Sequence, residues 1–180
     1  MKSNVMGMII AILAFITIIL PWYSATPTLF GETRAAAHAS LLDLVNPARA
    51  FSGLLGGQAF AQVILPWPIW VALTLIIIGG LLGLIASFII GGKGKRLLVV
   101  AGILVLLSPI IFAIGFASQG IPLFGSVEVL VFVPPITLHG TVALYLSFGF
   151  FFVVIVAVLM FISTKKHPME AEADSPLSPQ

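Results

Sequence analysis

Few side chains in this sequence could carry chemistry, and they lie in its polar stretches. The candidates for a metal or acid–base site are carboxylates and imidazoles expected on one side of a membrane: Glu32, His38, Asp43, Glu128 and His139. Such groups bind divalent metals or exchange protons when they converge. No two histidines show metal-ligand spacing, so solvated loop residues are the alternative interpretation.

Known catalytic motifs are missing from the sequence. The chain has no cysteine, which removes thiolate metal sites, disulfides and thiol catalysis. It also contains no phosphate-binding G-x-x-x-x-G-K-[ST] loop, no G-x-S-x-G nucleophile elbow and no H-E-x-x-H helix. We therefore expect no catalytic residue, no cofactor site and no metal ligand. No basic patch with interleaved aromatic residues exists, so nucleic acid is not an expected partner.

Long apolar runs dominate the chain instead. Hydrophobic residues make up 60% of the sequence and charged residues 8%, which is far from the balance of a soluble domain. About 20 apolar residues cross a bilayer core as a helix. The runs predict an all-α membrane protein, a four-transmembrane-helix antiparallel bundle with spans at about 5–23, 68–90, 97–117 and 140–163. A cleaved signal peptide is the alternative interpretation of the first run.

None of these runs contains an Asp, Glu, Lys, Arg or His. Ionisable residues inside a membrane usually mark proton relays and ion pathways. Their absence from the runs argues against a pump or a coupled transporter.

The distribution of basic residues predicts the orientation, because lysine and arginine near span ends stay preferentially cytoplasmic. Arg34 and Arg49 fall outside, whereas six cations fall inside: Lys2, Lys93, Lys95, Arg96, Lys165 and Lys166. We expect a plasma-membrane protein with both termini cytoplasmic. Its membrane domain would cover 1–164, with a tight inner turn at 91–96, outer loops at 24–67 and 118–139, and a disordered tail at 165–180.

Small residues form a stripe along the second predicted span. Ala72, Gly79, Gly83 and Ser87 follow one another at steps of seven, four and four residues. Small side chains let membrane helices approach closely. The stripe predicts a helix-packing face, against a neighbouring helix of the same chain or, alternatively, against a partner subunit. Ser108-Pro109 in the third run predicts a kink at which the serine hydroxyl satisfies a freed carbonyl.

The two outer loops differ in pattern. The first contains apolar residues at helical spacing, which predicts two short helices broken at Asn46. The second predicts a short β-hairpin, with strands at 121–124 and 127–133 around a Gly125-Ser126 turn. An apolar strand with an open edge invites pairing with another chain. We expect an interaction surface formed by Val127, Val129, Leu130, Val131 and Phe132.

Four spans, cytoplasmic ends, a long first outer loop, a tight inner turn and a β-rich second outer loop resemble the claudin-like tetraspan layout. In that family the outer loops build a small sheet that makes contacts between proteins. The resemblance is one of topology over the whole chain, and it assigns no functional residue. It implies a protein that works through outer contacts.

The function expected from the sequence is therefore that of a non-enzymatic membrane protein, an accessory or assembly subunit of a larger membrane complex. Its partners would be membrane lipid and other membrane protein subunits. One alternative is an oligomeric channel or small-solute transporter built through the glycine stripe. A second is a redox enzyme subunit whose cofactor ligands come from another chain.

Overall fold

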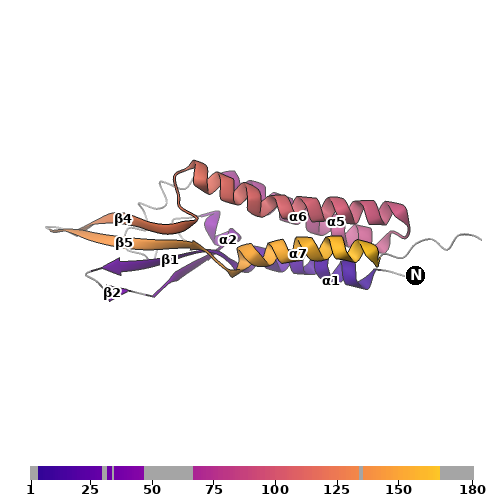
Figure 1. Ribbon diagram of the computed structural model, residues 1–180, viewed down its shortest axis with the longest axis horizontal. Helices are drawn as coiled ribbons and strands as arrows, with labels where there is room; N and C mark the ends of the chain where they lie inside the picture. The colour runs from indigo at the N-terminus through magenta and orange to yellow at the C-terminus, as the bar shows by residue number, and fades with distance from the viewer. Residues whose placement is uncertain (1–3, 30–31, 34, 47–66, 134–135, 167–180) are drawn as a thin grey trace, which may run out of the picture.

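The computed structural model describes residues 4–29, 32–33, 35–46, 67–133 and 136–166. It is elongated, with the long helices side by side at one end and a β-sheet extending beyond them at the other (Figure 1). The expected tail beyond 166 and the expected second short helix after Asn46 lie outside the described residues.

The helices make up more of the described chain than the strands do. The long ones are α1 (Val5–Ile19), α5 (Trp67–Phe88), α6 (Gly92–Ser118) and α7 (Phe148–Lys165), and α2 (Leu41–Leu44) is a single turn. Both α1 and α6 pack against α5 and α7. Within the described residues, three helices (α5, α6 and α7) are long and apolar enough to cross a membrane, as predicted, whereas α1 is apolar but shorter.

Each long helix presents a stripe of exposed aliphatic and aromatic side chains at alternating steps of three and four residues. On α1 the stripe is Val5, Ile9, Ile12, Ile16 and Ile19, and on α7 it is Phe148, Phe151, Ile155, Val158 and Ile162. That spacing follows one face of a helix. A continuous apolar face of this kind suits contact with lipid tails and not with water.

The turn between α5 and α6 is tighter than the sequence analysis expected. Gly91 adopts a φ of 88°, a left-handed conformation that favours glycine, and α6 begins at the next residue. Lys93, Lys95 and Arg96 therefore belong to the first turns of a helix and not to a loop. Within α6, the Ser108 hydroxyl donates to the Val105 carbonyl at 2.8 Å. Pro109 leaves that carbonyl without its helical partner, so the predicted compensation is confirmed.

The strands form one antiparallel sheet. They are β1 (Pro21–Leu29), β2 (Glu32–Thr33), β3 (Ala37–Ser40), β4 (Phe124–Val133) and β5 (Ile136–Leu146). The five-stranded sheet has the order β2-β1-β5-β4, and β3 also pairs with β1. The expectation of an all-α fold with only a short hairpin is thus corrected, because both outer loops contribute strands to a shared sheet.

Three boundaries also differ from the expected ones. The first helix ends at Ile19, and strand β1 (Pro21–Leu29) replaces the expected end of the first span and the start of the first loop, whereas α2 lies where the first short helix was expected. Residues 140–146 belong to β5, so α7 begins at Phe148 and not near Gly140. The strand over 127–133 is confirmed, but its partner is β5 and not 121–124. Gly125 lies inside β4 with a φ of 149°, so Gly125-Ser126 is part of a strand and not the expected turn.

Candidate functional site

The sheet joins the helices through two strands that continue helices directly. Strand β1 follows α1 after Leu20, and β5 leads into α7 through Ser147. The Ser147 amide donates to the Trp22 carbonyl at 2.9 Å, and β1 and β5 pair from Tyr23↔Leu146 to Leu29↔Gly140. Because its two central strands are extensions of two packed helices, the sheet is fixed to the helices and not carried on a loose loop.

An aromatic cluster fills this junction. Trp22 stands edge-on to Phe112 and Phe150, with ring centroids 5.3 and 5.8 Å away, and its indole N–H donates to the Thr17 carbonyl at 2.7 Å. Phe112 stacks on Phe116 at 4.3 Å. Tryptophan favours the membrane–water interface, yet Trp22 is completely buried within the protein. The hydrogen-bonded indole explains how the polar N–H is accommodated there.

Tyr23 completes the same cluster on the sheet side. Its ring meets Phe116 edge-on at 5.2 Å, and its hydroxyl donates to the Pro122 carbonyl at 2.5 Å. Burial raises the pKa of the Tyr23 phenol well above its ordinary range. The neutral hydroxyl therefore ties β1 to the segment that precedes β4.

The far side of the sheet ends in β4. This strand pairs with β5 over its whole length, from Phe124↔Tyr145 to Val133↔Ile136, and it stands last in the strand order. An edge strand directs alternate backbone N–H and C=O groups away from the sheet. Phe124 at its start is 62% exposed, a high value for a phenylalanine on a soluble surface. Among the residues that the structure describes, the outer edge of β4 is therefore a long, partly apolar border with no strand paired to it.

The expected interaction residues all lie in β4. Val127 is half-buried and packs against the core, whereas Glu128 is exposed. Val129, Leu130, Val131 and Phe132 are placed by their backbone pairing alone, opposite Gly140, His139, Leu138 and Thr137 of β5. Their side chains lie outside the described part of the structure.

Among the described side chains, the candidates for a metal or acid–base site do not come together; His139 is placed in β5 by its backbone pairing alone. Asp43 accepts hydrogen bonds from the Ser40 amide and hydroxyl at 3.0 and 2.6 Å, in a capping box at the start of α2. His38 Nδ1 lies 2.7 Å from the hydroxyl of Ser24, a completely buried cross-strand neighbour. Glu32 lies in β2 and Glu128 in β4, with the two central strands between them. No group of three metal-ligating side chains occurs among the described residues.

The helix-packing residues lie inside the helical region. Ala72 and Ser87 are buried, and the Ser87 hydroxyl donates to the Gly83 carbonyl at 2.7 Å. A Cβ at Gly83 would lie 3.2 Å from the Ala11 Cβ and 3.4 Å from the Met160 Cε. The stripe therefore faces α1, α6 and α7 of the same chain.

The five described cations lie at the end of the helices opposite the sheet. They are Lys93, Lys95 and Arg96 at the start of α6 and Lys165 and Lys166 at the end of α7. All of them are exposed. The described carboxylates lie in β2, α2 and β4, in or beside the sheet. Among the described residues, basic side chains therefore lie at one end of the long axis and acidic side chains at the other.

Asn4 was missed by the sequence analysis. Its side-chain oxygen accepts from the Gly7 amide at 3.0 Å and caps α1. Its backbone amide donates to the Ser87 carbonyl at 2.9 Å, and its side-chain amide donates to the Ser163 carbonyl at 3.4 Å. One residue thus connects three helices at the cation-rich end. An asparagine directly before an apolar run is an N-cap signal, so the capping role of Asn4 could have been predicted from the sequence.

The sequence matches no protein-family model, and it matches no curated protein.

Proposed function

We propose that this chain is a four-span membrane protein that acts through contact between its outer sheet and another membrane protein, as an accessory or assembly subunit of a larger complex. The observation that carries the proposal is the β4 edge, which pairs with no other described strand, on a sheet fixed to the helices by β1 and β5. Backbone pairing to such an edge is a common way to bind an extended segment of a partner.

In this proposal α1 is the fourth span. It lies against α5 and α7, and its outer stripe is as apolar as those of the longer helices. Its 15 residues span about 22 Å as a helix, so the bilayer would have to thin slightly or the flanking residues would have to complete the crossing.

The proposed orientation places the cation-rich end in the cytoplasm and the sheet outside a plasma membrane. Positive residues near span ends favour the cytoplasmic side, and the five described cations share one end. Both termini are cytoplasmic in this arrangement.

The contact proposal is tested by site-specific photocrosslinking in the native membrane. A photoreactive phenylalanine analogue at Phe124 lies on the β4 edge, and the same analogue at Thr33 lies in β2 on the opposite edge and serves as the matched control. We expect an adduct with another membrane protein from position 124 and none from position 33. An adduct between two copies of this chain would favour the channel alternative, and equal labelling from both edges would contradict an edge-specific contact.

A double substitution that introduces positive charge tests the same β4 surface. Val129→Lys with Val131→Lys places two cations on β4, while Glu32→Lys with Thr33→Lys loads the opposite edge. We expect the first variant to lose the partner identified by crosslinking and the second to keep it. If the β4 variant retains its partner while folded, the contact runs through the helices instead.

A further inference from the structure

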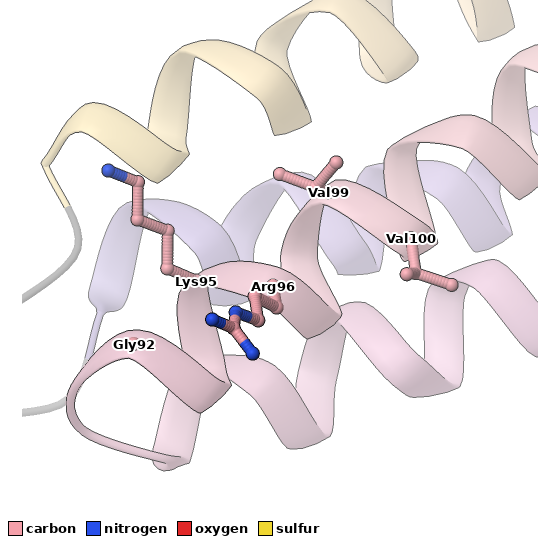
Figure 2. Close-up of a pocket in the computed structure, with 5 residues that line it drawn as sticks. All are labelled: Gly92, Lys95, Arg96, Val99 and Val100. Carbon is pink, nitrogen blue, oxygen red and sulfur yellow. The ribbon is translucent and has the colours of Figure 1, made fainter.

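A hollow opens on the surface of α6 at the cation-rich end. Its volume is about 490 Å³, and it is lined by Gly92, Lys95, Arg96, Val99 and Val100. Steps of three and four residues place these positions on one face of the helix. Figure 2 shows Lys95 and Arg96 in the first turns of α6 and the two valines one turn further along.

The lining surface is mostly apolar, and Lys95 and Arg96 add two charged groups to it. The side chains of Lys95 and Arg96 are exposed at the mouth, and Lys95 reaches toward the ribbon of α7 (Figure 2). Val99 is half-buried, and Val100 is 45% exposed. A Cβ at Gly92 would contact no other group, so the space beside the cations is open.

The apolar part of the lining continues along the helix. Exposed aliphatic residues follow Val100 at alternating steps of three and four, as Ile103, Leu107, Ile110 and Ile114. This stripe runs from the hollow toward the sheet end of α6. It provides a track on which a long hydrocarbon chain could lie after leaving the hollow.

The cations have no described acidic partner at their own end. The carboxylates of the described residues are Glu32, Asp43 and Glu128, in or beside the sheet at the far end. A basic group in a concave apolar site at the membrane edge favours an anionic ligand. A guanidinium additionally matches phosphate oxygens through paired N–H donors.

We propose that this hollow binds one anionic phospholipid. The headgroup phosphate contacts Lys95 and Arg96, and an acyl chain runs along Val99, Val100 and the aliphatic stripe. A free phosphate would use only the two charged groups of the lining. The acidic residues of the chain's own tail, Glu170, Glu172 and Asp174, would likewise leave the apolar part without a ligand.

The proposal is separate from the contact at the β4 edge, which lies at the opposite end of the molecule. It requires only that the helices lie in a bilayer. Failure of the crosslinking experiment at Phe124 would therefore leave the lipid site standing, and failure at the lipid site would leave the contact proposal standing.

The test is lipid binding by the purified full-length chain in detergent micelles. Dioleoyl phosphatidylglycerol and dioleoyl phosphatidylcholine are added separately, and bound lipid is counted by native mass spectrometry. We expect the wild-type chain to retain one phosphatidylglycerol in preference to phosphatidylcholine. Lys95→Gln with Arg96→Gln should weaken that retention on the order of tenfold or more, because the variant loses both cations that attract the anionic headgroup.

The matched control is Lys165→Gln with Lys166→Gln. It removes the same charge from the same end of the molecule but lies outside the hollow. We expect it to keep the lipid preference. Equal loss in both double variants would mean that total charge, and not this site, selects the lipid, and the proposal would be wrong.

Two further variants distinguish a bound lipid from the other possible occupants of the hollow, which are free phosphate and the chain's own tail. Val100→Trp fills the apolar part while both cations remain, and we expect it to reduce retention as well. Undiminished binding in Val100→Trp, or displacement of the lipid by millimolar inorganic phosphate, would identify a simple anion site. If lipid binds only after residues 167–180 are removed, the tail occupies the hollow and the proposal fails. A thermal melt without added lipid verifies that each variant is folded.

Discussion

Gly79 of α5 lies so close to α6 that a Cβ on it would stand 2.7 Å from the Val105 Cγ2 and 3.0 Å from the Ala101 carbonyl oxygen. The second distance is the more restrictive, because a backbone atom cannot turn aside as a side chain can. The closest approach of these two helices is therefore set by a missing side chain.

Gly79→Leu should destabilise the protein by about 2 kcal/mol or more, since overpacking a dense interface forces the backbones apart. Thermal unfolding in detergent and the folded yield measure the effect. Leu81→Phe is the control, because Leu81 on the same helix is 50% exposed. If Gly79→Leu melts like the wild type, α5 and α6 are not held as closely as described.

Asn4→Ala should cost about 1–2 kcal/mol, because it removes the α1 cap and the contact with the Ser163 carbonyl. Asn4→Asp retains the capping oxygen but loses the side-chain N–H donor, so it should fall between the alanine variant and the wild type. Because these contacts lie at the cation-rich end, we expect that end of the alanine variant to become more sensitive to protease. Equal stability of all three proteins would remove Asn4 as a connector of helices.

Tyr23→Phe should lower stability by about 1–2 kcal/mol at neutral pH, because the Pro122 carbonyl loses its donor. The raised pKa of Tyr23 means that the folded state keeps a proton that the unfolded state releases above about pH 10. This contribution to wild-type stability is complete below that pH and declines as the pH rises further. Alkaline melts of the two proteins should therefore converge, and a constant difference up to pH 11 would contradict the assignment.

The tyrosinate absorbance of the folded protein checks the same residue directly. The chain has two tyrosines, Tyr23 and Tyr145. Because Tyr23 stays protonated in the folded state, Tyr23→Phe should leave the tyrosinate signal at pH 11 unchanged. A loss of signal in the variant would show that Tyr23 ionises while folded.

The orientation is testable by cysteine labelling, since the natural chain has no cysteine. Thr33→Cys lies in the sheet, and Gly92→Cys lies at the start of α6 with open space around it. A membrane-impermeant maleimide applied to intact cells should label position 33 alone. Gly92→Cys should react only after the membrane is permeabilised. The reverse pattern would invert the proposed topology.

Three apolar helices were predictable because their runs are long and free of charge, and α5 begins and ends within two residues of the expected span. The start of the last span was not. Residues 140–146 were joined to α7 because they are apolar, although Val142, Leu144 and Leu146 are buried alternately with more exposed neighbours. That period of two is the mark of a strand, but it appears in the burial and not in the sequence, where residues 142–146 are apolar without a break.

The pairing of β1 with β5 was harder to predict, because the two strands are far apart in the chain and no local pattern matches one to the other. The lack of a local pattern also limited the prediction of the candidate site. The carboxylates and histidines of the outer loops could be grouped by side of the membrane, but only the strand order separates Glu32 from Glu128. Residue type alone would place Trp22 and Tyr23 at the membrane surface, whereas phenylalanines of α6 and α7 pack around Trp22.

The continuity of α1 with β1 and of β5 with α7 has a consequence for the order of synthesis. Thr26 of β1 and its neighbour Tyr145 of β5 are 119 residues apart, so β1 leaves the ribosome long before β5 exists. The sheet can close only after β5 has been made, and until then β1 lacks its central partner. Limited proteolysis of ribosome-bound chains in which β5 is either absent or fully emerged should reveal this as late protection of residues 21–29.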